Sequence, residues 1–97
     1  MGIFDFSEIL LQRFYENFRS LYTSKYDAQM ALSRCCYTFH VDEESSEVFL
    51  VLDTCQERLG DVVNTSQLYL QAAKNTGGFD GVWIHVMMEP FKLLRIS

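Results

Sequence analysis

The sequence predicts a two-layer α+β fold, with three helices on one face of a small, mainly antiparallel sheet of three to four strands. Apolar residues recur at helical spacing over 10–21 and 55–73, whereas they alternate with other residues over 37–52 and 82–88. The predicted order is therefore α-α-β-β-α-β, with a further strand at the end as an option. At 97 residues and 48% hydrophobic content, the chain suits one domain over 1–97 and leaves no room for a second core.

The first helix is expected to begin at about residue 6. Asp5-Phe6-Ser7-Glu8 has the spacing of a capping box, in which Asp5 accepts from the amide of Glu8 and Glu8 reaches back. An apolar stripe follows at spacings of four, four and three residues: Leu10, Phe14, Phe18 and Leu21. This stripe predicts one wide buried face, and its breadth leaves a homodimer contact through the same helix as the alternative.

A short second helix and a β-hairpin are expected next. Ser24 is a candidate N-cap, and helical spacing of apolar residues continues to about Arg34. The period then changes to two on both sides of the acidic segment 42–47, which predicts two strands. A four-residue loop over 43–46 brings three apolar pairs to one face. These pairs are Val41 with Val48, Phe39 with Leu50, and Tyr37 with Leu52.

The segment Thr54-Cys55-Gln56-Glu57 is the clearest capping box in the chain and predicts the start of a third helix. The stripe of this helix runs to Ala73, the helix is expected to reach about Asn75, and Gly77-Gly78 provides the stop. Gly60 and the segment 64–66 are poor helix formers, so we expect a kink or a break there.

A third strand is expected over 82–88. Val82, Ile84, Val86 and Met88 alternate there with Trp83, His85 and Met87. Pro90 interrupts the alternation, because proline lacks the N–H that a sheet requires. The segment 91–96 is then either a fourth short strand or a turn of helix.

Residues that carry chemistry form no catalytic or metal-binding pattern in the sequence. His40 and His85 have no neighbouring nucleophile with an orienting acid, so we expect structural histidines. Cys35, Cys36 and Cys55 are odd in number and lack the spacing of zinc ligands, so we expect reduced thiols. The prediction is a protein that is not an enzyme and has neither a cofactor nor a metal.

The placement of charge is the feature that indicates a function. Thirteen acids and eight bases give a formal charge of −5. Between Asp42 and Asp61 lie seven acids and one base, whereas the rest of the chain holds six acids and seven bases. An excess of acids disfavours direct binding of nucleic acid and favours a basic partner surface. The predicted partner-binding residues are Asp42, Glu43, Glu44, Glu47, Asp53, Glu57 and Asp61.

On the predicted fold, these acids converge into one anionic ridge. Four of them occupy the hairpin loop, and the last three recur every four residues at the start of the third helix, about 6 Å apart. This spacing resembles that of phosphates along a strand, which predicts imitation of a nucleic-acid backbone. The alternative is a solvated turn beside a helix N-terminus that favours acids.

In size, charge and the acidic segment 42–61, the chain resembles small phage-encoded inhibitors of host defence, especially anti-CRISPR proteins that mimic nucleic acid. The resemblance implies a non-enzymatic inhibitor whose carboxylates block a basic DNA- or RNA-binding groove, such as that of a CRISPR surveillance complex. The alternative function is that of an immunity or antitoxin protein that neutralises a basic nuclease toxin.

The location of the protein is predicted from two absences in the sequence. The first eight residues lack the basic and apolar regions of a signal peptide. The longest apolar run, Val48–Leu52, is too short to cross a bilayer. We therefore expect a soluble cytoplasmic protein without a membrane partner, located in the host cytoplasm if it is encoded by a phage.

Overall fold

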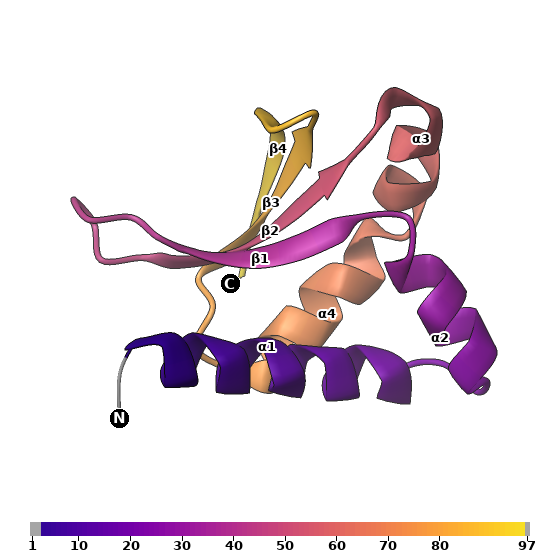
Figure 1. Cartoon of the computed structure of the whole chain (residues 1–97), viewed down its shortest axis with the longest axis horizontal. Coiled ribbons are helices and arrows are strands. Elements are labelled where there is room, and N and C mark those ends of the chain that lie inside the picture. Colours follow the sequence, from indigo (N-terminus) through magenta and orange to yellow (C-terminus); the bar gives the residue numbers. More distant parts are fainter. Residues whose placement is uncertain (1–2, 97) are drawn as a thin grey trace.

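Over residues 3–96, which the computed structural model describes, the chain forms four helices and four strands in consecutive pairs (Figure 1). Side chains are described from Glu8 to Ile96. The elements are α1 (Ile3–Ser20), α2 (Lys25–Leu32), β1 (Cys36–Val41), β2 (Val48–Thr54), α3 (Gln56–Asn64), α4 (Ser66–Thr76), β3 (Gly81–Val86) and β4 (Glu89–Arg95). The predicted α+β class is confirmed.

The strands form one sheet in the order β1-β2-β3-β4. The pairs β1/β2 and β3/β4 are antiparallel, but the central pair β2/β3 is parallel. The sheet is therefore mixed, and the expectation of a mainly antiparallel sheet is wrong. The parallel pair arises because the chain leaves the end of β2, passes through α3 and α4, and returns to the opposite end of the sheet.

The core lies between the sheet and the helices, with α1 and α4 on the same side of the sheet (Figure 1). Its fully buried large side chains come from the predicted helical and strand stripes: Phe14, Phe18, Leu50, Leu52, Val62, Tyr69, Val82 and Ile84. Each such side chain stabilises the fold by roughly 1.5–3 kcal/mol relative to exposure. The buried face predicted for the first helix is thereby confirmed at Leu10, Phe14 and Phe18.

The starts of the first two helices differ in how well they follow the sequence. Helix α1 begins at Ile3, so Asp5 lies inside the helix and not in front of it; the side chains of the predicted capping box before Glu8 are outside the described residues. Helix α2 begins after Ser24, whose side chain accepts a hydrogen bond from the amide of Asp27, as predicted.

The register of the β1–β2 hairpin is the predicted one. Val41 pairs with Val48, Phe39 with Leu50, and Tyr37 with Leu52. The amide of Asp42 donates to the carbonyl of Glu47 at 2.8 Å and closes the loop over 43–46. The loop length and the apolar alternation were therefore sufficient to determine this register.

The predicted third helix is two helices, which makes four in place of three within residues 3–96. The break falls at Thr65, whose hydroxyl donates to the carbonyls of Asp61 at 2.9 Å and Val62 at 3.3 Å. Such local bonds compete with the helical pattern, so the break expected near Gly60 and 64–66 is confirmed. Helix α4 ends at the predicted stop, where Gly77 and Gly78 have positive φ angles of 75° and 89°.

The capping box predicted at Thr54 is wrong. Thr54 is the last residue of β2, and its buried hydroxyl donates to the carbonyl of Arg34 at 2.7 Å. The N-cap of α3 is Cys55, which makes no side-chain capping bond. The threonine hydroxyl is thus used to join β2 to the end of the α2 segment.

The C-terminal part forms a second hairpin. Strand β3 ends at Val86, two residues earlier than predicted, and Met87 and Met88 make a tight turn. The final segment is a strand, β4, which starts at Glu89 and includes Pro90. Proline is tolerated there because β4 is an edge strand of the sheet.

Candidate interaction surfaces

The seven acids predicted to bind a partner lie in two groups at opposite ends of β2. Asp42, Glu43, Glu44 and Glu47 belong to the β1–β2 loop, whereas Asp53, Glu57 and Asp61 lie near the start of α3. The six residue steps from Glu47 to Asp53 along β2 span about 20 Å at the usual rise per residue. Figure 1 shows the β1–β2 loop and α3 at opposite sides of the molecule. The predicted single anionic ridge is therefore wrong.

Three of the seven acids are used by the fold. Glu47 forms an ion pair with Arg95 at 2.7 Å. Asp42 accepts a hydrogen bond from the amide of Glu44 at 3.1 Å, and Asp53 accepts one from the amide of Met88 at 2.8 Å. The remaining four, which are exposed and form no ion pair among the described residues, are Glu43, Glu44, Glu57 and Asp61.

Glu57 is held in its charged form. A hydrogen bond from the thiol of Cys55 and another from its own backbone N–H lower the pKa of this fully exposed carboxyl. Asp61 follows one helical turn later and is also exposed. The two exposed carboxyl groups of α3 are thus about 6 Å apart along the helix axis.

The turn of the β3–β4 hairpin has an unusual sequence for its conformation. Met87 and Met88 have φ angles of 52° and 71°, in the left-handed region that two-residue hairpin turns fill with Asn-Gly. A residue with a side chain is disfavoured there by roughly 1–2 kcal/mol. Two bonds hold the turn: the amide of Met87 donates to the carbonyl of Thr54 at 3.0 Å, and Met88 donates to Asp53.

This turn displays apolar side chains to solvent. Met87 is 69% exposed, Met88 81% and Phe91 54%. Phe91 is skipped in the pairing of β3 with β4, because Ile84 pairs with Lys92 and His85 with Pro90. The register of the two strands thus shifts between Ile84 and His85, as it does at a β-bulge. Sequence reasoning missed this feature, because the alternation of apolar residues continues through Met88.

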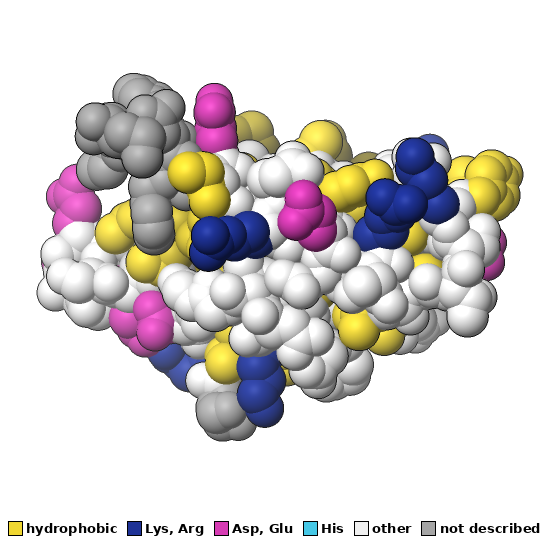
Figure 2. Space-filling model, turned by 90° about the horizontal axis from the view of Figure 1, so that it is seen from below, with side chains coloured by type: hydrophobic (Ala, Val, Ile, Leu, Met, Phe, Trp, Pro, Cys, Tyr) yellow, Lys and Arg dark blue, Asp and Glu magenta, His cyan; other side chains and the backbone are white. Residues whose placement is uncertain are grey.

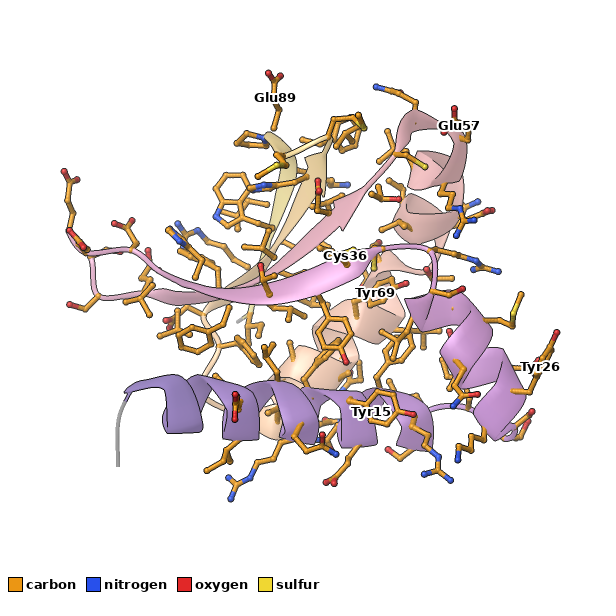
Figure 3. All side chains as sticks on the ribbon, in the orientation of Figure 1. Tyr15, Tyr26, Cys36, Glu57, Tyr69 and Glu89 are labelled. Carbon is orange, nitrogen blue, oxygen red and sulfur yellow. The ribbon has the colours of Figure 1, made fainter. Side chains whose placement is uncertain are left out.

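A groove lies between α3 and the β3–β4 turn. It encloses about 370 Å³ and is lined by Gln56, Leu59, Val86, Met87, Glu89, Pro90 and Phe91. Figure 3 shows Glu57 and Glu89 toward the same end of the molecule as the β3–β4 turn, and both are exposed. We call this set of residues, together with Met88 of the same turn, the methionine groove. Its lining combines apolar side chains with the amide of Gln56 and the carboxylate of Glu89.

The face of the sheet opposite the core carries a second depression, of about 530 Å³. His40, Trp83 and His85 line it, and the ring of His85 meets that of Trp83 edge-on at 6.0 Å. Phe49 also lies on this face but is only 3% exposed, because Arg95 lies over its ring at 6.0 Å and Trp83 packs against its edge. The aromatic surface here is thus partly covered by its own neighbours.

The three cysteines are free thiols; Cys35 is partly buried and packs against the core, whereas Cys36 is exposed. The Sγ of Cys35 lies 3.9 Å from the hydroxyl of Tyr69, which donates to the carbonyl of Ala31 at 2.9 Å. Burial raises the pKa of the Cys35 thiol to about 11. Within the described residues, no group of three or more His, Cys, Asp or Glu side chains is placed to hold a metal ion.

Iodoacetamide at pH 8 is expected to label Cys36 first and Cys35 at least about ten times more slowly. The exposed Cys36 is accessible, whereas the raised pKa of Cys35 leaves only about one thiol in a thousand as thiolate at that pH. Fragment-ion mass spectrometry separates the two adjacent residues. The labelling rate of Cys35 should rise steadily toward pH 11, and equal rates for both residues at pH 8 would contradict the structure.

The structure gives no support to the homodimer contact predicted through α1. Phe14 and Phe18 of the apolar stripe have no exposed surface. Figure 2 shows the side of the molecule on which α1 lies, and its acidic and basic side chains are interspersed there. No charged patch of one sign marks this side as the acidic surface.

Comparison of the chain with protein-family models, with curated proteins and with solved structures finds no match. Among residues 3–96, none of the helices combines the length and the apolar character that spanning a membrane requires.

Proposed function

We propose that the protein is a non-enzymatic interaction protein that binds a cationic surface of a partner protein through exposed carboxylates. The observation that supports this is that four of the seven acids of segment 42–61 are exposed and form no ion pair among the described residues: Glu43, Glu44, Glu57 and Asp61. Surface carboxylates of this kind steer and orient a basic partner. If the partner uses the same cationic surface to bind its own ligand or substrate, binding of this protein inhibits the partner.

The structure narrows the sequence-based hypothesis of nucleic-acid imitation. A continuous phosphate-like row requires one ridge, and only the pair Glu57 and Asp61 retains the required spacing of about 6 Å. We therefore propose that the protein binds a local cationic patch of its partner. It does not imitate a whole nucleic-acid strand. A CRISPR surveillance complex and a nuclease toxin both offer such patches, and both remain predictions about the partner's identity.

Two matched charge reversals test the proposal and locate the binding end. One variant carries Glu43→Lys with Glu44→Lys, and the other carries Glu57→Lys with Asp61→Lys. Each substitution adds two positive charges, so each double variant changes the formal charge from −5 to −1. A third variant, Glu8→Lys with Glu16→Lys on the exposed side of α1, has the same formal charge and serves as the control.

The partner is first captured from cells of the natural host, and its affinity for each variant is then measured across a salt series. We expect one of the two test variants to bind at least about tenfold more weakly, with a reduced salt dependence, while the α1 variant stays within about twofold of the parent. Thermal unfolding followed by circular dichroism verifies that each variant folds. Equal affinities for all three variants and the parent would end the proposal.

A further inference from the structure

We infer that the methionine groove binds an amphipathic helix of the partner, with apolar residues on its inner side and lysine or arginine along its margins. This inference rests on the proposed function and assigns it to the α3 end of the molecule. Three features carry it: the exposed apolar side chains, the strained turn that displays them, and the exposed carboxylate of Glu89 in the lining, with Glu57 at the same end of the molecule.

The apolar surface is unlike an ordinary scatter of exposed residues. Met87, Met88 and Phe91 are adjacent on one hairpin, and each exposes more than half of its surface. Methionine is unbranched and polarisable, so it adapts to differently shaped apolar partners. A cluster of this kind fits helix-in-groove recognition, in which side chains at positions i, i+3 or i+4, and i+7 enter an apolar surface.

The backbone of the turn strengthens the argument. Asn-Gly would adopt the same left-handed pair of φ angles without the disfavour that Met87 and Met88 incur. The hydrogen bonds that the Asp53 carboxylate and the Thr54 carbonyl accept come from the backbone amides of Met88 and Met87 and involve neither methionine side chain. The turn therefore does not require methionine for its hydrogen bonds, and residues held in a disfavoured backbone conformation cluster at functional sites.

Charge complementarity selects a cationic partner. Glu89 lines the groove, Glu57 lies at the same end of the molecule, and both are exposed. The base of α3, Arg58, donates to the carbonyl of Ser33 at 3.0 Å and is directed toward the α2 segment. Lysine or arginine at the margins of a bound helix would meet these carboxylates, whereas an anionic lipid surface would be repelled.

Methyl NMR of the methionines tests the inference directly. The probe is a synthetic 18-residue helical peptide with leucine at i, i+3, i+4 and i+7 and lysine elsewhere, and the matched control peptide has glutamate for lysine. We expect the lysine peptide to shift the methyl signals of Met87 and Met88. Met30, which is 47% exposed on α2, is the internal control and should not shift.

The deciding variant is Met87→Asn with Met88→Gly. It supplies the residues that the turn prefers, so thermal stability should be unchanged or higher, while affinity for the lysine peptide should fall at least tenfold. Retained affinity in this variant, absence of binding by the parent, or equal shifts of Met30 would overturn the inference. It would equally be overturned if the two methyl signals responded only to protein concentration or to phosphatidylcholine vesicles.

The two proposals fail in different ways. If the Asn-Gly variant binds the captured host partner as well as the parent does, but Glu57→Lys with Asp61→Lys weakens that binding, the carboxylates act without the groove. If neither variant matters and Glu43→Lys with Glu44→Lys does, the β1–β2 loop is the binding end. In both cases the inference about the groove is wrong and the proposed function stands.

Discussion

Replacing Phe18 with alanine is expected to lower the free energy of unfolding by about 3–5 kcal/mol. The ring of Phe18 is fully buried and stacks on Tyr69 with a centroid separation of 4.8 Å and an interplanar angle of 13°. It also packs on Tyr22 at 5.2 Å and on Phe14 at 5.9 Å. Alanine would remove the aromatic contact between α1 and α4 and leave a cavity that surrounding rings fill only in part.

Urea unfolding followed by far-ultraviolet circular dichroism measures this loss. Ile9→Ala is the control, because Ile9 lies on the same helix but is exposed, and its truncation should change stability by no more than about 0.5 kcal/mol. Similar losses in both variants would mean that α1 does not pack through the stripe that contains Phe18. The comparison therefore tests the position of α1 as well as the strength of one contact.

Phe18 and the β1–β2 register illustrate what local sequence patterns predict. A spacing of four, four and three residues identifies the buried face of a helix without knowledge of what covers it. The pairing of Phe39 with Leu50 follows from alternation on two strands joined by a short loop. Both inferences use residues that are near each other in the chain, and the structure confirms both.

The incorrect inferences depended on contacts between distant residues. Nothing near β2 indicates that its other neighbour is β3, which lies beyond two helices, in parallel orientation. Thr54 has the sequence context of a helix cap, but the carbonyl of Arg34, twenty residues earlier, takes its hydroxyl. Local preference was overridden in both cases by tertiary structure.

The candidate site was partly predictable. Counting charges identifies the acidic segment, and four of its seven acids remain exposed and outside the ion pair, including Glu57 and Asp61. Glu57 and Asp61 lie far from the β1–β2 loop because the extended strand β2 lies between them. The prediction of a single ridge neglected the length of this strand. The turn at Met87 and Met88 lacked the Asn-Gly signal by which such turns are recognised, so the groove beside it could not be inferred from the sequence.

Gly81→Ala is expected to destabilise the protein by about 1–3 kcal/mol. A Cβ atom at Gly81 would lie 2.8 Å from the carbonyl oxygen of Leu94 and 3.3 Å from two carbons of the Phe49 ring. Leu94 belongs to β4, which pairs with β3, so the backbone would have to separate the two strands to make room. The ring of Phe49 lies over this glycine, and the guanidinium of Arg95 lies over the ring.

Gly60→Ala provides the matched control with the opposite sign. Gly60 lies inside α3, and no atom approaches within 4 Å of the position that its Cβ would occupy. Alanine there should raise stability by about 0.5–1 kcal/mol, because it lowers the entropy lost when the helix forms. Urea unfolding of both variants distinguishes a steric clash at Gly81 from a general effect of replacing glycine by alanine.

Hydrogen exchange provides a second measurement. The amide of Ile96 donates to the carbonyl of Asp80 at 3.0 Å, and its exchange should be faster only in Gly81→Ala. Unchanged exchange and stability in that variant would mean that β3 and β4 do not approach each other at Gly81 as described.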